Sequence, residues 1–554
     1  MARVNTSIDP RSGYCSSTST FYSKRHPLSL PSAEFLDVAT FIASRPHSHA
    51  NHAFIDAPTG LRLTFSHLWR AVHSVATWLS SRIGLLKGDV VLILSANSIY
   101  FPIAVLSALR IGAIVTTANV LNTPREIARQ IADSNPKLAF AAPPFASKLA
   151  DANLPIVLLP GGRTEASAPI GRLRIVASIE EMMAAEPSRD PLDRRVRQGD
   201  PATILYSSGT TGASKGVVAT HRNLIAATEA SARRLRLQGG EHTFLATIPM
   251  FHVYGLTLAV LSAPASGLTA VVLPKFEIDV MASAIATYRV TYVPLVPPIL
   301  AAMEREAARL RAAHDLGSLR TVLTGGAALG RETMEEFRRE YPTVVILQGY
   351  AMTETNGGGT CMETEEESGR CGTAGLLTAG MEAKIVDPES GEALGVNRTG
   401  ELWLRGPSVM KGYFGNPEAT RSALGSDGWL QTGDLCCFDE DGYMVVVDRL
   451  KELIKYKGYQ VAPAELESLL IAHDEIMDAA VIPFPDKEAG QLPMAFVVRK
   501  TGSNLSDSMV MSYVQKQVAP YKRIRRVEFV DVIPKNPSGK ILRKDLVKLA
   551  TSRL

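Results

Sequence analysis

A segment rich in glycine and hydroxyl side chains constrains this chain most, because it lies between two runs of strand-like sequence. Residues 207–216 hold three glycines, five serines or threonines and a single lysine, Lys215, and they follow the apolar run 202–206. Glycines let backbone N–H groups approach an anion, hydroxyl groups add hydrogen bonds, and the lysine adds positive charge. A flexible linker is the alternative, but linkers rarely join two strands. We therefore predict a phosphate-binding loop, and its spacing differs from that of a P-loop.

Apolar strand-like runs alternate with helical patterns through most of the chain, which is too long for a single core. The first such runs are 89–94, 113–117 and 138–142 as strands, with 101–112 and 124–135 as helices. Alternation of this kind indicates βαβ units and largely parallel sheets. The later strand-like runs are 202–206, 268–273, 291–294, 321–324 and 344–347.

The predicted fold class is α/β. We expect a large N-terminal domain with mostly parallel sheets flanked by helices and a smaller β-barrel-like portion, which includes the runs 381–386 and 401–405. A small, mobile α+β C-terminal domain should follow. The predicted boundaries are 1–30 for a loose N-terminal arm, 31–448 for the large domain and 449–554 for the small domain.

Composition and charge exclude several classes of protein. The chain is 46% hydrophobic and 21% charged, with a formal net charge of +4, which gives no argument for a nucleic-acid partner. Residues 243–274 lack charged side chains, but prolines and glycines interrupt them, so we expect a buried core and no transmembrane span. The five cysteines have no Cys-x-x-Cys spacing, which argues against a zinc site and favours a reducing compartment.

Six segments, in this order, resemble the signatures of the acyl-adenylate-forming, or AMP-binding, superfamily. They are 207–217, 348–354, 400–406, 432–434, 448–460 and 537–540. The likeness is strongest to plant 4-coumarate:CoA ligases and their peroxisomal 4-coumarate:CoA ligase-like relatives. It implies an enzyme in which a carboxylate attacks the α-phosphorus of ATP to form an acyl-adenylate and pyrophosphate. The thiol of coenzyme A then displaces AMP.

Other readings of the resemblance remain open. A luciferase-like or carrier-loading enzyme would share the first half-reaction and pass the acyl group to another acceptor, and a 4-coumarate:CoA ligase proper would use a hydroxycinnamate. A nonenzymatic sensor of acyl groups or nucleotides would have no need for an adenylating lysine. The expected small-molecule partners are ATP, coenzyme A and a carboxylic acid, with Mg²⁺ as the metal.

The resemblance also implies roles for particular residues. Lys540 and His252 would be catalytic, and Lys540 would neutralise charge that develops at the α-phosphate. Glu354 would bind magnesium, a hard cation that prefers oxygen ligands. The residues implied to bind ATP or AMP are Ser207, Ser208, Gly209, Thr210, Thr211, Lys215, Gln348, Gly349, Thr353, Asp434, Arg449 and Lys540. Those implied around the acyl group and adenylate are Tyr254, Leu258, Gly326, Gly349, Lys451, Lys455 and Gln460. Coenzyme A would meet Lys275, Lys457 and Gly458, and the small domain would rotate about a hinge at Lys451.

The chain departs from the hydroxycinnamate ligases directly after Glu354. Those enzymes carry Ala-Gly-Pro-Val where this chain has Thr355–Gly358. Loss of the proline and valine side chains should widen or reshape the pocket floor, so hydroxycinnamate specificity does not carry over. We expect a fatty acid, a jasmonate precursor or a phenylpropanoid-type acid.

The last three residues, Ser552–Leu554, resemble the Ser-Lys-Leu address that the peroxisomal import receptor reads. Arg553 replaces the lysine and keeps its positive charge. The sequence therefore predicts a peroxisomal location, with that receptor as a protein partner.

Overall fold

The computed structural model describes residues 8–48, 51–160, 173–188, 195–207, 214–237, 242–326, 329, 331–450, 454–461, 463–534, 541 and 543–551. Contacts divide them into two compact units. The first draws its residues from Met1–Val120, Ala128–Tyr206 and Gly216–Asp448. The second draws its residues from Leu121–Ile127, Ser207–Lys215 and Arg449–Leu554.

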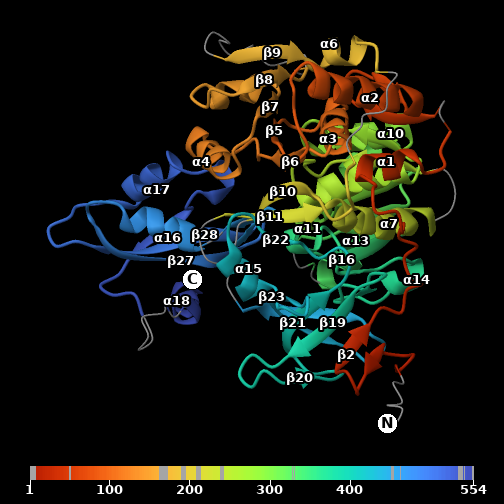
Figure 1. Ribbon diagram of the computed structural model, residues 1–554. Helices are drawn as coiled ribbons and strands as arrows, with labels where there is room; N and C mark the ends of the chain where they lie inside the picture. Colours follow the sequence, from red (N-terminus) through yellow and green to blue (C-terminus); the bar gives the residue numbers. More distant parts are fainter. Residues whose placement is uncertain are drawn as a thin grey trace. The chain divides into compact units, whose positions relative to one another are not determined.

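An eight-stranded sheet contains β10 and β11, the two strands that flank the predicted phosphate-binding loop in the sequence (Figure 1). In spatial order its strands are β22 (Gly412–Tyr413), β11 (Lys215–Thr220), β10 (Pro201–Ser207), β6 (Ile114–Thr117), β5 (Val90–Leu94), β7 (Leu138–Ala141), β8 (Pro155–Leu158) and β9 (Arg174–Ser178). The pairs from β10 to β9 are parallel. Every residue of β5 is buried, as expected for a strand covered on both faces.

A nine-stranded sheet forms the second layer of strands in this unit. In spatial order its strands are β18 (Leu376–Leu377), β17 (Thr360–Cys361), β16 (Val345–Tyr350), β15 (Thr321–Thr324), β14 (Tyr292–Leu295), β12 (Thr243–Ala246), β13 (Thr269–Val272), β3 (His52–Asp56) and β4 (Arg62–Thr64). The pairs from β16 to β3 are parallel. The predicted mostly parallel arrangement is thus confirmed.

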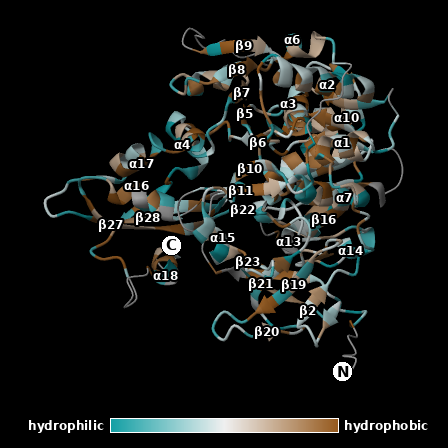
Figure 2. Ribbon diagram, viewed as in Figure 1, coloured by the Kyte–Doolittle hydropathy of each residue, from teal (hydrophilic) through white to brown (hydrophobic). Residues whose placement is uncertain are grey.

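Helices lie beside these sheets, and Figure 2 shows brown and teal mixed along them. The longest are α2 (Phe65–Ser81), α3 (Tyr100–Arg110), α4 (Pro124–Ser134), α7 (His221–Leu237) and α10 (Ile278–Tyr288). The shorter ones include α1 (Val38–Ala43), α6 (Ile179–Ala184), α11 (Pro297–Arg305), α12 (Ala307–Ala313), α13 (Arg331–Glu340), α14 (Glu365–Ser368) and α15 (Pro417–Ala423). The uncharged stretch 243–274 is confirmed as strand, loop, helix and strand, and no described helix is both long and apolar enough to cross a bilayer.

The third sheet includes the N-terminal residues, which differ from the loose arm predicted for residues 1–30. Its order is β1 (Tyr14–Cys15), β2 (Thr20–Tyr22), β19 (Glu382–Val386), β21 (Gly400–Arg405), β23 (Leu430–Phe438) and β24 (Met444–Arg449), with β20 (Ala393–Leu394) beside β19. The pairs from β1 to β23 are antiparallel. Phe21 is fully buried and stacks on Phe438, with ring centroids 4.5 Å apart. Burial of this aromatic ring holds the N-terminal strands in the sheet.

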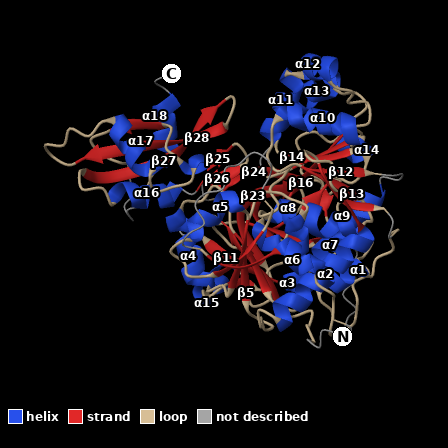
Figure 3. Cartoon of the chain, turned by 90° about the horizontal axis from the view of Figure 1, so that it is seen from above, coloured by secondary structure: helices blue, strands red, loops and turns tan. Residues whose placement is uncertain are grey.

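The second unit contains a five-stranded sheet with helices beside it (Figure 3). The order is β26 (Tyr459–Val461), β25 (Ile454–Tyr456), β28 (Gly490–Arg499) and β27 (Ile476–Asp486), and β29 (Arg526–Phe529) pairs with β28. The helices are α16 (Pro463–Ile471), α17 (Asp507–Gln515) and α18 (Arg543–Thr551). This α+β composition matches the prediction.

Candidate active site

Strand β16 carries the centre of the candidate site at its carboxyl end. Gln348, Gly349 and Tyr350 are its last three residues, and a single turn, η3 (Thr353–Thr355), follows. Because β14, β15 and β16 are parallel, their carboxyl ends meet at one edge of the sheet. Open α/β sheets bind ligands at such an edge. The buried side-chain oxygen of Gln348 accepts no hydrogen bond within the described residues, so it can accept one from a ligand.

A buried carboxylate lies opposite this edge. Asp434, on β23, is 4% exposed, and its Oδ2 accepts a hydrogen bond of 2.7 Å from the Tyr350 hydroxyl. Burial and the adjacent carboxylate raise the pKa of Tyr350 well above its usual value, so the phenol stays protonated and donates. Gly433, the residue before Asp434, has a φ of +73°, a left-handed conformation that favours glycine. This turn and the tyrosine together hold the Asp434 carboxylate in one orientation.

A second buried carboxylate, Glu354, lies in η3. It is 7% exposed, and its Oε1 accepts a hydrogen bond of 3.0 Å from the Tyr413 hydroxyl on β22. Partial burial and this carboxylate raise the pKa of Tyr413, so it also remains a donor. Within the described ranges, no three carboxylate, histidine or cysteine side chains gather as a metal cluster. A single carboxylate nevertheless fits Mg²⁺, which binds one or two protein carboxylates and takes its other ligands from phosphates and water.

His252 begins the helical segment that follows β12 along the chain. Its Nδ1 caps α8 (Val253–Gly255) by accepting a hydrogen bond of 3.3 Å from the Tyr254 backbone. Solvent reaches the ring, yet the protein atoms packed around it lower the pKa of His252, which favours the neutral imidazole. The Tyr254 hydroxyl donates to the Leu323 carbonyl of β15 at 3.1 Å, which fixes this side chain against the neighbouring strand.

Tight packing shapes the wall between these elements. A Cβ atom at Gly349 would lie 3.2 Å from the Thr360 carbonyl and 3.3 Å from the Cys361 sulfur, so only glycine fits without displacement. Gly326 has φ +80° at the end of β15. Leu258 is 3% exposed in the π-helix η2 (Leu256–Ser262), and π-helical turns occur often at functional sites. The structure thus brings His252, Tyr254, Leu258, Gly326 and Gly349 to one region of the first unit.

The remaining predicted site residues do not belong to the region just described. Ser207 ends β10 and Lys215 begins β11, and the Ser214 hydroxyl donates to the Ser207 carbonyl at 2.9 Å, so the two ends of the loop meet. The predictions that fall outside the described residues concern Ser208, Gly209, Thr210, Thr211, Lys451 and Lys540. The side chains of Arg449, in β24, and Gln460, in β26, are likewise not described.

The predicted coenzyme A residues lie on two turns. Lys457 and Gly458 form the turn between β25 and β26, where both have positive φ values, +48° and +81°. Lys455 precedes them, and its backbone N–H donates to Gln491 at 2.7 Å. Lys275 follows β13 and is highly exposed, and its ammonium pairs with Glu277 at 3.1 Å. The contacts of these lysines within the described residues do not indicate which ligand they bind.

Comparison with known families decides the class of this protein. Residues 42–414 match the model of the AMP-binding enzyme, and residues 465–540 match that of the AMP-binding enzyme C-terminal domain. The chain belongs to the AMP-binding enzyme family. This match confirms the predicted family and α/β fold, and together with the CoA ligases among the relatives in the next paragraph it confirms the predicted ATP-dependent carboxylate:CoA ligase, which works through an acyl-adenylate.

Curated relatives of this AMP-binding enzyme cover nearly its full length. It is 62% identical over 548 residues to a "Probable CoA ligase CCL5" of Humulus lupulus, covering 99% of this chain and 98% of the relative. It is 59% identical over 548 residues to "Peroxisomal OPC-8:0-CoA ligase 1" of Arabidopsis thaliana, covering 99% of both. Among solved structures, the amide bond synthetase McbA of Marinactinospora thermotolerans aligns with a TM-score of 0.79 and 28% identity, covering 93% of this chain and 99% of that one.

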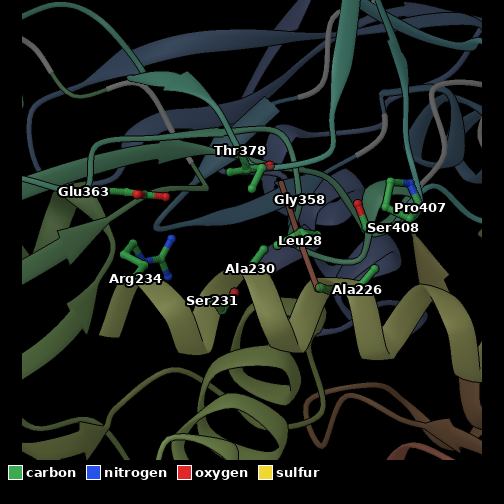
Figure 4. Close-up of a pocket in the computed structure, with 13 residues that line it drawn as sticks. Leu28, Ala226, Ala230, Ser231, Arg234, Gly358, Glu363, Thr378, Pro407 and Ser408 are labelled. Carbon is green, nitrogen blue, oxygen red and sulfur yellow. The ribbon is translucent and has the colours of Figure 1, made fainter. Parts of the chain in front are cut away.

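This AMP-binding enzyme has a cavity that the sequence indicated only in part (Figure 4). Gly357 and Gly358, which replace the proline and valine of hydroxycinnamate ligases, both line it. The facing wall comes from α7, whose lining residues are Ala226, Ala227, Ala230, Ser231 and Arg234. Sequence reasoning gave no role to Arg234, nor to Tyr350 and Tyr413, because the contacts of these residues join segments far apart in the chain.

Proposed function

We propose that this ligase prefers an aliphatic acid, either a fatty acid or a jasmonate-precursor-type carboxylate, over a hydroxycinnamate. The observation that carries the proposal is that Gly357 and Gly358, which have no side chains, both line a small cavity. The 59% identity to an OPC-8:0-CoA ligase supports the same class of acid. Without the proline and valine side chains of hydroxycinnamate ligases, the acyl pocket has more room for a longer substrate. It also makes fewer contacts with a flat aromatic ring.

The proposed machinery follows the two half-reactions. For adenylation, residues 207–215 would hold the β- and γ-phosphates, Asp434 with Arg449 would bind the ribose, and Lys540 would stabilise charge at the α-phosphate. His252 and Tyr254 would line the path of the acid's carboxylate. The buried position of Asp434 and its hydrogen bond from Tyr350 support its part, because a fixed carboxylate can accept from both ribose hydroxyls.

For the second half-reaction, we propose that the domain 449–554 rotates about Lys451 relative to the domain 31–448. The turn that carries Lys457 and Gly458, together with Lys275, would then meet coenzyme A. Glu354 would hold the Mg²⁺ that accompanies ATP, and the ion would neutralise phosphate charge. The buried position of Glu354, oriented by Tyr413, supports this assignment.

The choice of acid is tested with a side-by-side kinetic panel. Purified enzyme with ATP, Mg²⁺ and coenzyme A should give a higher kcat/KM for medium- or long-chain aliphatic acids than for 4-coumarate, by about tenfold or more. The thioester is detected by mass. Preference for 4-coumarate over every aliphatic acid would contradict the proposal and favour a 4-coumarate:CoA ligase proper. AMP release that does not depend on coenzyme A would favour a luciferase-like or carrier-loading enzyme.

We also propose a peroxisomal location, read from Ser552–Leu554 by the import receptor. The name of the Arabidopsis relative supports it. A fluorescent protein fused to the N-terminus should enter peroxisomes, whereas the same protein fused to the C-terminus should remain outside, because the receptor reads a free carboxyl end. Entry of both fusion proteins into peroxisomes would contradict the proposal that Ser552–Leu554 is the import signal.

A further inference from the structure

Residues 247–251 form the loop between β12 and His252, and a side chain that follows the other sheet holds this His252 loop. Asn97 lies three residues after β5 and is 5% exposed. Its Oδ1 accepts from the Met250 backbone N–H at 2.7 Å, and its Nδ2 donates to the Ile248 carbonyl at 3.1 Å. The carboxamide thus pairs with the loop backbone as a neighbouring strand would, because it offers an acceptor and a donor side by side.

Thr117 holds the same loop at a second point. It is the last residue of β6 and is 5% exposed, and its hydroxyl donates to the Phe251 carbonyl at 2.6 Å. Phe251 directly precedes His252, so this bond fixes the backbone next to the proposed catalytic side chain. Because β5 and β6 are parallel neighbours, Asn97 and Thr117 reach the loop from the same edge of the eight-stranded sheet.

The His252 loop packs tightly against the helical turn that follows it. A Cβ atom at Gly255 would lie 2.2 Å from the Pro249 carbonyl oxygen, and that oxygen accepts a hydrogen bond of 3.1 Å from the His252 backbone N–H. A shift of the loop would therefore also shift His252. The Nδ1 atom of His252 accepts from the Tyr254 backbone, so the proton of the neutral ring lies on Nε2, which can donate it to a hydrogen bond with the acid.

The end of β6 also contacts the strand that leads into the predicted phosphate-binding loop. In the parallel register of β6 and β10, Thr117 lies opposite Leu205, and β10 ends at Ser207. The hydroxyl of the neighbouring Thr116 donates to the Ile204 carbonyl at 2.7 Å, which helps to fix this register. One strand end therefore supports both the His252 loop and the strand from which the phosphate-binding loop starts.

We propose that Asn97 and Thr117 are positioning residues that hold His252, and with it the acid's carboxylate, in place for attack on the α-phosphate of ATP. Both would act through the His252 loop without touching a substrate. This inference rests on the proposed function, which places His252 beside the carboxylate. A displacement of about 1 Å costs about 10²-fold in rate, so loss of one support should lower the rate of adenylation and leave the affinity for ATP unchanged.

The first test removes the Thr117 hydroxyl and keeps the shape of the side chain. Carboxylate-dependent pyrophosphate exchange, with the best acid of the kinetic panel as the probe, gives kcat and KM for ATP separately. Thr117→Val should lower kcat by about 10- to 100-fold, with KM for ATP within about threefold of wild type. Thr117→Ser keeps a hydroxyl and should restore kcat to within about threefold. The matched control is Thr269→Val, which removes a hydroxyl bond of 2.8 Å to the His52 carbonyl and should match the wild type.

The second test is a double-mutant cycle with His252→Ala. If Thr117 acts through His252, adding Thr117→Val to His252→Ala should cost no more than about threefold, whereas independent losses would multiply. Multiplied losses, or a Thr117→Val variant as active as Thr269→Val, would overturn the inference alone. A His252→Ala variant with the kcat of the wild type would instead reject the proposed part of His252, and the inference would fall with it.

Asn97→Ala tests the other support of the loop. It should also lower kcat at constant KM for ATP, and this loss should likewise disappear in the His252→Ala background. Thermal unfolding shows whether the variant is folded. If it is not, the shape-conserving Thr117→Val variant decides the test. A folded Asn97→Ala variant with the kcat of the wild type would overturn the part assigned to Asn97.

Discussion

Lys540→Ala should lower the rate of acyl-adenylate formation by about 10²- to 10³-fold. The reason is electrostatic: the lysine is proposed to neutralise charge that develops at the α-phosphate only during adenylation. Carboxylate-dependent exchange of pyrophosphate into ATP measures this half-reaction alone. Thioester formation from a synthetic acyl-adenylate and coenzyme A measures the other, and it should stay within a few-fold of wild type.

The control is Lys548→Ala, which removes an exposed lysine from α18. Both of its half-reactions should match those of the wild type, because an exposed substitution of this kind has little effect on stability. Equal losses in the two half-reactions of Lys540→Ala would contradict the separate role of this lysine and would point to a general defect in nucleotide binding.

Glu354→Gln should lower adenylation by about 10²- to 10³-fold, because the proposed ligand to Mg²⁺ loses its negative charge. The amide keeps an oxygen that can accept from Tyr413, so the local fold should persist. Pyrophosphate exchange is measured across a magnesium titration, and the variant should require a higher concentration of the ion. Circular dichroism with thermal unfolding checks that the protein is intact.

Tyr413→Phe is the matched control, since it removes the hydrogen bond from Tyr413 to Glu354 and leaves the Glu354 carboxylate in place. Loss of one hydrogen bond costs about 1 kcal/mol, so adenylation should fall by less than about tenfold. If the two variants lose activity equally, orientation by Tyr413 and not metal binding would be the important property of Glu354. Full activity of Glu354→Gln at the wild-type magnesium concentration would refute the assignment.

The sequence predicted the parallel strands well because their apolar runs are long and bounded by turns. The run 89–94 becomes β5, 321–324 becomes β15, and 344–347 begins one residue before β16. The N-terminal strands could not be found in this way. β1 and β2 have two and three residues, which is too short for an alternating pattern to show.

The candidate site was predictable where its residues are close in sequence, and only partly elsewhere. Residues 348–354 gave both the sheet edge and Glu354 from one motif. The contact between Tyr350 and Asp434 spans 84 residues, so no local pattern reveals it. Arg234 lies beside Arg233 in a helix that reads as amphipathic, and only the packing against Cys361 distinguishes the buried arginine from its neighbour.

The stacking of Phe21 on Phe438 also bears on how the chain is made in the cell. The two rings belong to strands of one sheet, so the first strands to leave the ribosome must wait for strand β23 before they can be buried. At about 5–20 residues per second, roughly 20–80 seconds pass between synthesis of the two segments. During that interval an apolar edge near the start of the nascent chain is a natural binding site for chaperones.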